Sequence, residues 1–198
     1  VRFEGTTTGA PAGAIQLDTD FTTADGAVWN VSGTGIEWVN DYLDAGTLTN
    51  TGLIRFTGTS GSRGIRNAGT SLTNTGTVEH SGTGRFYVYN GAVATNTSTW
   101  RLSDEADVYG FSGAGTFRNT GTFRRDGAGV TQFTGGGLVV ENTGTLDVRG
   151  GEVRFDVAST HTGATFAVAA DALLRFNAGG VRFEGTTTGA PAGAIQLD

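Results

Sequence analysis

The chain has 198 residues, 34 glycines, two prolines, no cysteine and a formal net charge of −6. All 13 of its basic residues are arginine, and this acidic balance argues against binding of a nucleic-acid phosphate backbone. The lack of cysteine excludes disulfides, thiol catalysis and cysteine-ligated zinc. No apolar run approaches the roughly 20 residues that cross a bilayer, so we expect no membrane insertion of this segment.

The opening segment, VRFEGTTTGAPAGAIQLD at positions 1–18, recurs unchanged at positions 181–198, an offset of 181 − 1 = 180. We predict that residues 1–180 form one tandem repeat unit and that residues 181–198 start the next identical unit. A duplicated tag is the alternative. Within the opening segment we expect strands at Val1–Glu4 and Ala14–Leu17, joined by a turn that contains Pro11.

The stretch that follows shows the repeat less clearly. In the sequence DGAVW, Asp25 is expected to take the place that asparagine holds in later coils, with Trp29 four residues on. Ile36, Trp38 and Tyr42 are expected to continue the inward-facing set of side chains through this coil.

Tetrads that resemble NTGT dominate the middle of the chain. They begin at Asn50, Asn74, Asn96, Asn119 and Asn142, and the differences between consecutive positions are 24, 22, 23 and 23. An apolar or small residue lies two positions before each asparagine, and an apolar residue lies four positions after it. The first set is Leu48, Leu72, Ala94, Phe117 and Val140, and the second is Ile54, Val78, Trp100, Phe123 and Leu146.

A regular period with fixed inward positions is typical of one structural unit stacked on itself. It predicts an all-β fold, a right-handed parallel β-helix or β-solenoid, with about 23 residues per coil and about eight coils per 180-residue repeat. Three sheets that close on one core give parallel strands the covering layer that they need. In pairs such as Arg55-Phe56 and Arg154-Phe155, alternation predicts phenylalanine inward and arginine outward.

We interpret the five asparagines as a structural ladder. A side-chain amide has both donors and an acceptor, so it can bond the asparagine one coil above and one coil below. Asparagine also tolerates the left-handed backbone of a tight corner, and the glycine two residues later suits the same corner.

After Asn142 the period shortens and the motif degrades. His161-Thr162-Gly163-Ala164 replaces the tetrad, with Ser159 two positions before it and Thr165 at the position four residues after His161. The coil is expected to bulge or narrow there. We interpret both histidines, His80 and His161, as surface or turn residues.

The Thr-x-Thr triplets after the asparagines are the candidate ligand face. Flat arrays of this kind resemble those of ice-binding β-solenoids, so the alternative function is a repetitive binding surface for ice or glycans. The middle residue is usually glycine and the triplet lies beside a corner, which disfavours a flat face. The candidate residues are Thr75, Thr77, Thr97, Thr99, Thr120, Thr122, Thr143 and Thr145.

Clusters of carboxylates are interpreted as solvated turn charges. Asp104-Glu105-Asp107 and the pair Asp18 and Asp20 are the candidates for a loosely held cation. The glycine-rich calcium repeat, with its regularly recurring aspartate, is absent from the sequence.

Asp147 and Glu152 are the pair considered for glycoside hydrolysis. An active site is expected to break the repeat with a long insertion or a non-periodic polar cluster, and the sequence has neither. We therefore expect a protein that is not an enzyme, with no catalytic residue, no cofactor and no metal.

The NTGTL and NTGTF motifs resemble repeats of large exported bacterial proteins of the autotransporter-passenger and filamentous-haemagglutinin kind. The resemblance covers residues 50–146 well and the rest loosely. It implies a bacterial extracellular or cell-surface location and a role as the stalk, sheath or adhesin shaft of a fibre. The implied partners are identical repeats joined end to end, with lateral fibre contacts and glycans as further candidates.

The two identical segments also predict the geometry of such a fibre. We predict that eight coils separate them, that the end of each unit is covered by the next unit, and that the two segments superpose by a translation along the fibre axis plus a modest twist. With strands stacked about 4.8 Å apart, the repeat of the fibre is about 38 Å.

Overall fold

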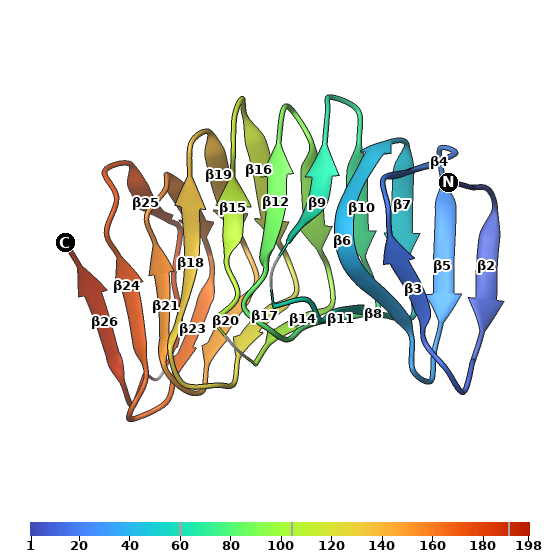
Figure 1. Ribbon diagram of the computed structural model, residues 1–198. Helices are drawn as coiled ribbons and strands as arrows, with labels where there is room; N and C mark the ends of the chain where they lie inside the picture. Colours follow the sequence, from blue (N-terminus) through green and yellow to red (C-terminus); the bar gives the residue numbers. More distant parts are fainter. Residues whose placement is uncertain (60, 104, 190) are drawn as a thin grey trace.

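The computed structural model describes residues 1–59, 61–103, 105–189 and 191–198. Their regular structure is all β, and parallel strands stack into a β-solenoid of about nine turns, roughly 22 residues apart. Figure 1 shows the strands side by side along the length of the molecule, with the N-terminal coils at one end and the C-terminal coils at the other. The predicted parallel β-solenoid is thereby confirmed.

Each coil crosses three faces in turn, called here faces A, B and C. Face A contains β1 (Arg2–Phe3), β4 (Phe21–Thr23), the second half of β6 (Ile36–Ala45), β9 (Ser62–Arg66), β12 (Arg85–Tyr89), β15 (Val108–Gly110), β18 (Val130–Gly135), β21 (Glu152–Phe155), β24 (Leu173–Phe176) and β26 (Ala194–Leu197).

Face B contains β2 (Thr6–Gly9), β5 (Ala27–Val31), β7 (Thr47–Asn50), β10 (Ser71–Asn74), β13 (Val93–Asn96), β16 (Gly115–Asn119), β19 (Leu138–Asn142), β22 (Ser159–Thr162) and β25 (Val181–Glu184). Face C contains β3 (Ile15–Asp18), the first half of β6, β8 (Leu53–Phe56), β11 (Thr77–His80), β14 (Thr99–Leu102), β17 (Thr122–Arg125), β20 (Thr145–Val148) and β23 (Thr165–Val168).

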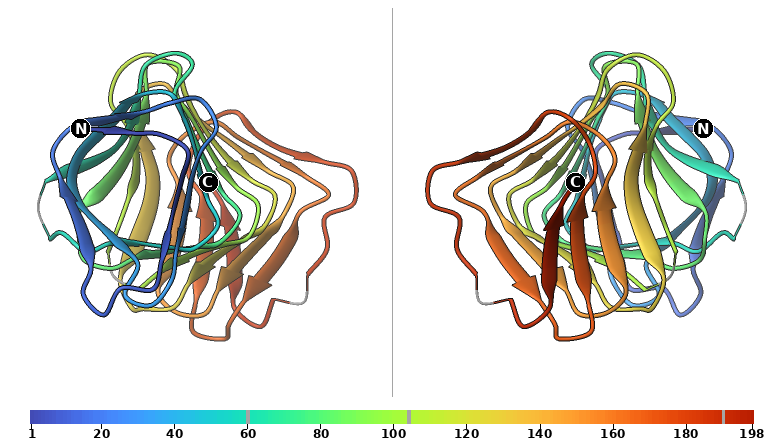
Figure 2. Two further views of the ribbon diagram at one scale, coloured as in Figure 1. Left: turned by 90° about the vertical axis from the view of Figure 1, so that its right-hand side faces the viewer. Right: turned by 90° about the vertical axis from the view of Figure 1, so that its left-hand side faces the viewer.

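The long strand β6 runs without a break from face C onto face A. Its hydrogen bonds therefore join these two faces into one 17-stranded sheet, while face B forms a separate nine-stranded sheet. Figure 2 looks along the solenoid and shows the coils nested around one outline that turns gradually between the two ends. The three faces enclose a single core of buried side chains.

The core contains every apolar position that the tetrad pattern predicts. All ten residues, two before and four after each asparagine, are at most 2% exposed. Equivalent residues pair in consecutive coils, as with Val78, Trp100 and Phe123 on face C. Phe56 and Phe155 are buried while the arginine before each is partly exposed, so the predicted alternation is confirmed.

The first two coils depart from the sequence prediction. The expected turn after Glu4 contains β2, which pairs with β5 on face B. Tyr42 does not point into the core. Asp41 has a φ of 66°, and the pairing of β6 shifts register there, so Leu43 takes the buried position and Tyr42 is half-buried on the outside.

The two identical 18-residue segments lie on different faces, which contradicts the expected simple translation. In the first copy β1, β2 and β3 occupy faces A, B and C. In the second copy β25 lies on face B and β26 on face A. Eight steps along face A lead from β1 to β24, and the chain then crosses to face B before Val181. The 180-residue offset therefore spans eight coils plus one face, because the coils are on average shorter than the spacing of the tetrads suggested.

Candidate functional site

The five tetrad asparagines form one buried column at the end of face B. Each donates from Nδ2 to Oδ1 of the asparagine in the next coil, at 2.7 Å from Asn50 to Asn74 and 2.8 Å in each later step to Asn142. A second amide contact reaches a backbone carbonyl of the next coil, such as Asn74 Nδ2 to Thr99 O at 2.9 Å. Since no ladder asparagine is more than 1% exposed, these bonds satisfy amides that water cannot reach.

The backbone at the ladder differs from the expected left-handed corner. The asparagines end strands, and among described non-glycine residues positive φ occurs at Asp41, Asn67 and Asn90. In four of the five tetrads the residue two positions later is glycine, and Ser98 takes that place in the tetrad that begins at Asn96. A Cβ on Gly76 would lie 2.3 Å from Gly52 O, and one on Gly144 would lie 2.1 Å from Gly121 O. Glycine thus lets consecutive coils approach at this corner.

Aromatic residues end the ladder on both sides. Trp29, in the coil before Asn50, pairs with Asn50, and His161, in the coil after Asn142, pairs with Asn142. Both rings are at most 1% exposed. The prediction that Asp25 takes the asparagine place is therefore wrong, since Trp29 itself occupies the column.

His161 is buried and is not the surface or turn residue expected. Its Nδ1 lies 3.3 Å from Asn142 Nδ2, and its Nε2 lies 3.1 Å from Ser159 Oγ. Because an amide nitrogen only donates, Nδ1 accepts and Nε2 carries the hydrogen. Burial lowers the pKa of His161 to about 4, so the ring is neutral at pH 7. His80 is also buried, with Nε2 donating to Gly84 O at 2.8 Å.

The corner after His161 holds one more residue than the other tetrad corners. Thr145 pairs with Thr165, and Leu146 pairs with Phe166. The core position therefore lies five residues after His161, and Phe166, 6% exposed, fills it instead of Thr165. The degraded tetrad keeps the stack by bulging.

The structure brings the eight candidate threonines together as two columns on either side of a corner. Those directly after the asparagines are exposed, and those after the glycines begin the strands of face C. In the first column the hydroxyl is used within the protein: Thr75 Oγ1 donates to Asn50 O at 3.0 Å, and Thr97 Oγ1 donates to Asn74 O at 3.0 Å. The columns turn the corner and so do not form one flat strand face.

Two of the carboxylates considered for a cation, Asp20 and Asp107, form ion pairs with arginines. Asp20 accepts from Arg66 at 2.8 Å, and Asp107 accepts from Arg85 at 3.3 Å. Burial raises the pKa of Asp107. Asp104 lies outside the described residues. Among the residues described, no group of three or more His, Asp and Glu side chains is arranged to hold a metal.

The pair considered for glycoside hydrolysis lies on two different faces. Asp147 belongs to β20 on face C, where Arg149 donates to it at 2.8 Å, while Glu152 begins β21 on face A.

Two arginines of the described chain lie inside the solenoid, which the sequence analysis missed. Arg63 is 0% exposed and donates to Val39 O at 3.2 Å and to Gly58 O at 3.0 Å. Burial lowers its pKa to about 10, so it stays charged at neutral pH. Arg125, also 0% exposed, donates to Ala128 O. Both arginines bond the backbone that connects face C to face A. Each lies two residues from a core residue, Ile65 or Phe123, and side chains two apart on a strand point to the same side, so the alternation of the strand could have predicted that both point inward.

All four tyrosines of the chain gather on the outside of face A. Tyr42, Gly64, Tyr87 and Tyr109 share one outward column, and a Cβ on Gly64 would lie 2.1 Å from Tyr87 O. The ring centroids of Tyr42 and Tyr87 are 6.0 Å apart, and those of Tyr87 and Tyr109 are 5.2 Å apart. We call this group, with Tyr89 and Phe111 beside it, the tyrosine cluster.

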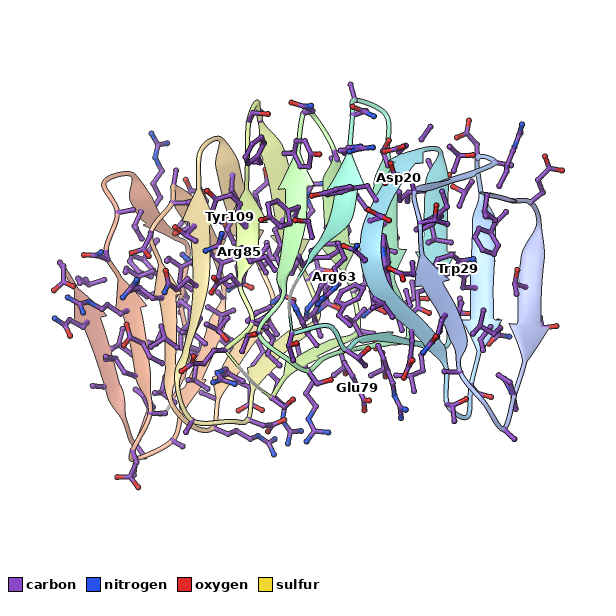
Figure 3. The ribbon with its side chains drawn as sticks, in the orientation of Figure 1. Asp20, Trp29, Arg63, Glu79, Arg85 and Tyr109 are labelled. Atoms are coloured by element: carbon purple, nitrogen blue, oxygen red, sulfur yellow. The ribbon has the colours of Figure 1, made fainter. Side chains whose placement is uncertain are left out.

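Charged groups border the tyrosine cluster. The guanidinium of Arg66 lies 4.5 Å from the centre of the Tyr42 ring, and that of Arg85 lies 4.6 Å from the centre of the Tyr109 ring. Figure 3 shows Arg85 and Tyr109 next to each other on face A, with Asp20 nearer the N-terminal end. Phe111 is 66% exposed, so the cluster offers an aromatic surface to solvent.

No family model, no curated protein and no solved structure matches the chain. Among the described residues, no helix is long and apolar enough to cross a membrane.

The ladder generates a stability prediction. Asn96→Ala removes the acceptor of one Asn74 amide hydrogen, although Asn74 Nδ2 keeps its bond to Thr99 O, and it removes the amide donor to Asn119 Oδ1; we expect the free energy of unfolding to fall by about 2–4 kcal/mol. Thr97→Val is the matched control, because it removes one hydrogen bond of an exposed residue in the same coil, and should cost under about 1 kcal/mol. Urea unfolding measures both. Equal losses in the two variants would contradict a stabilising ladder.

The buried ring of His161 generates a pH prediction. Its folded pKa of about 4 lies below the ordinary value of 6.5, so the unfolded chain binds more protons between these values and stability falls as pH decreases. From pH 7.5 to pH 5 we expect a loss of about 2 kcal/mol from this group.

The control is His161→Asn, which keeps an amide in the column and does not titrate. Between pH 7.5 and pH 5, the free energy of unfolding in urea should fall by about 2 kcal/mol less in this variant than in the unchanged chain. The same loss in both proteins would assign the pH dependence to other groups.

Proposed function

We propose that this chain is a structural, non-catalytic segment of a long fibre that lies outside a bacterial cell or on its surface, as a stalk, sheath or adhesin shaft. The observation that carries the proposal is the unbroken column of Asn50, Asn74, Asn96, Asn119 and Asn142 inside a continuous aromatic core. A solenoid coil contacts its two neighbours, so its stability grows by repetition along one axis. That property suits a protein whose function is to span a distance.

The outer charges support the same role. In the described part of the chain, ten of the 13 arginines form ion pairs with carboxylates of their own or a neighbouring coil, such as Arg118 with Glu141 at 2.7 Å and Arg55 with Glu79 at 3.1 Å. Outward residues also change from coil to coil: Glu79, Arg101, Arg124 and Asp147 stand in one row. A surface that neutralises itself and does not repeat is expected of a shaft. Its partners in this proposal are identical units end to end.

Cell-surface labelling tests this function. An antibody to the chain should label intact cells that make the protein, and protease added outside should remove the signal. An antibody to a cytoplasmic enzyme is the control and should label cells only after permeabilisation. If the chain is also labelled only after permeabilisation, the proposed location and the fibre role are wrong.

A second candidate function is a binding surface for glycans, and the tyrosine cluster is the observation that favours it. Aromatic rings beside Arg85 and Asp107 offer stacking surfaces and hydrogen-bonding groups together. The threonine columns, by contrast, turn a corner, and Thr75, Thr97 and Thr120 donate to backbone carbonyls of the neighbouring coil. This candidate, unlike the shaft, requires one particular stretch of face A.

Tyrosine fluorescence and glycan-array binding test the second candidate. Tyr109→Ala with Phe111→Ser should weaken retention of a bound glycan at least tenfold, and Thr97→Val should leave it unchanged. The opposite pattern would move the binding surface to the threonine columns. No retention of any glycan by the unchanged chain would reject both surfaces.

A further inference from the structure

The two identical 18-residue segments each use one edge for strand pairing, and the two edges are opposite. In the first copy, Arg2 pairs with Thr22 and Leu17 pairs with Trp38, both in the coil that follows. In the second copy, the equivalent Arg182 pairs with Thr160 and Leu197 pairs with Phe176, both in the coil before it. The same residues therefore form strands on either side.

The middle of the segment behaves in the same way. Thr8 pairs with Asn30 of the following coil in the first copy. Its equivalent, Thr188, forms a parallel bridge with Thr165 of the preceding coil, and their hydroxyls lie 3.0 Å apart. All three parts of the segment thus have a pairing partner before and after it, as a coil inside a solenoid requires.

Packing shows the same two-sided character. Phe3 contacts Phe21 and Trp29, with ring centroids 5.7 and 5.3 Å away. The equivalent Phe183 contacts His161 and Phe176, at 5.4 and 5.2 Å. The phenylalanine of the segment can therefore pack against aromatic side chains of the following coil, as Phe3 does, and of the preceding coil, as Phe183 does.

The segments also contain most of the large hydrophobic residues that are exposed in the described chain. Of the seven large hydrophobic residues exposed in the described chain, five belong to the two copies: Val1, Ile15, Phe183, Ile195 and Leu197. Ile15 and Ile195 are equivalent positions, each 39% exposed and each paired with a buried residue on its other side. These side chains lack cover because each copy has one neighbouring coil instead of two.

We infer that the 18-residue segment is a junction coil, shared between consecutive identical units, and that each unit is rotated by one face, about a third of a turn, relative to the one before. The rotation follows from the placement of β1 on face A and β25 on face B. This inference rests on the proposed function, in which identical units follow one another. Eight coils and one face at about 4.8 Å per coil give an advance of about 40 Å per unit.

The ends of the ladder agree with this rotation. After a turn by one face, the asparagine columns of two consecutive units lie at different corners, so no hydrogen bond can run from one ladder to the next. In this chain the column ends in a ring at each side, with His161 stacked against Phe183 and Trp29 packed against Phe3. Each ladder is thus completed within its own unit.

Spin labels on a two-unit chain, residues 1–180 followed by residues 1–198, test the junction coil. The chain has no cysteine, so each introduced cysteine is labelled alone. Thr160 of the first unit and Thr22 of the second both pair with the arginine of the junction coil, so Thr160→Cys with Thr22→Cys should place the labels two coil spacings apart, about 10 Å between backbones. Strong dipolar broadening of the continuous-wave spectrum is expected, relative to the two singly labelled chains.

The matched variant is Thr160→Cys in the first unit with Val28→Cys in the second, because β5 would follow face B if the units stacked without rotation. This pair should show weaker broadening than the first, because Thr160 and Val28 pair with residues of the junction coil that lie on different faces. Stronger broadening of this pair than of the first would show an unrotated stack, and no broadening in either pair would show that the units do not share the coil; both results overturn the inference. Circular dichroism confirms that each labelled chain is folded. Failure of surface labelling, by contrast, would reject the fibre role and leave these spectra unchanged.

Discussion

Register between coils is the constraint on which this structure depends, and the asparagine amides are what fix it. A buried amide without partners costs about 1–3 kcal/mol for each unpaired group, so a coil that slips by one residue loses its bonds to both neighbours. The Nδ2–Oδ1 distances of 2.7–2.8 Å between consecutive asparagines from Asn50 to Asn142 require that the face B strands of these coils stay in register, so that each asparagine lies directly over the next. Apolar side chains alone would tolerate more slippage, because their attraction has no direction.

That constraint explains why coils of unequal length still stack. The step from Asn142 to His161 is 161 − 142 = 19 residues, shorter than the step of 24 from Asn50 to Asn74, yet both keep the column. Length is absorbed at the corners, as the extra residue before Phe166 shows. Arg63 and Arg125 stabilise two of the longer corners from inside, because their guanidinium groups donate charge-assisted hydrogen bonds to backbone carbonyls there.

The outside of the solenoid follows different rules from the inside. Outward positions carry ion pairs that vary from coil to coil, and face A also carries the tyrosine cluster, where Gly64 leaves room for Tyr42 and Tyr87 to approach across it. A structural shaft and a local binding surface are therefore compatible within one chain, because the core fixes the shape without restricting what an outward position holds. In the proposed fibre, the exposed apolar residues of the two 18-residue copies are the surface that the coils of neighbouring units would cover.

The sequence by itself determined the period, the inward positions around each tetrad and the column of asparagines, because these depend on local spacing repeated in every coil. It did not determine which residues replace asparagine where the motif fades. Trp29 and His161 enter the column because strand pairing places them there. From the sequence, Trp29 was expected at the core position four residues after the column, and His161 was expected at the surface or in a turn. The face on which each 18-residue copy lies was likewise decided by tertiary structure. It depends on the summed lengths of all the coils between them, and a difference of one or two residues at each corner accumulates to a third of a turn.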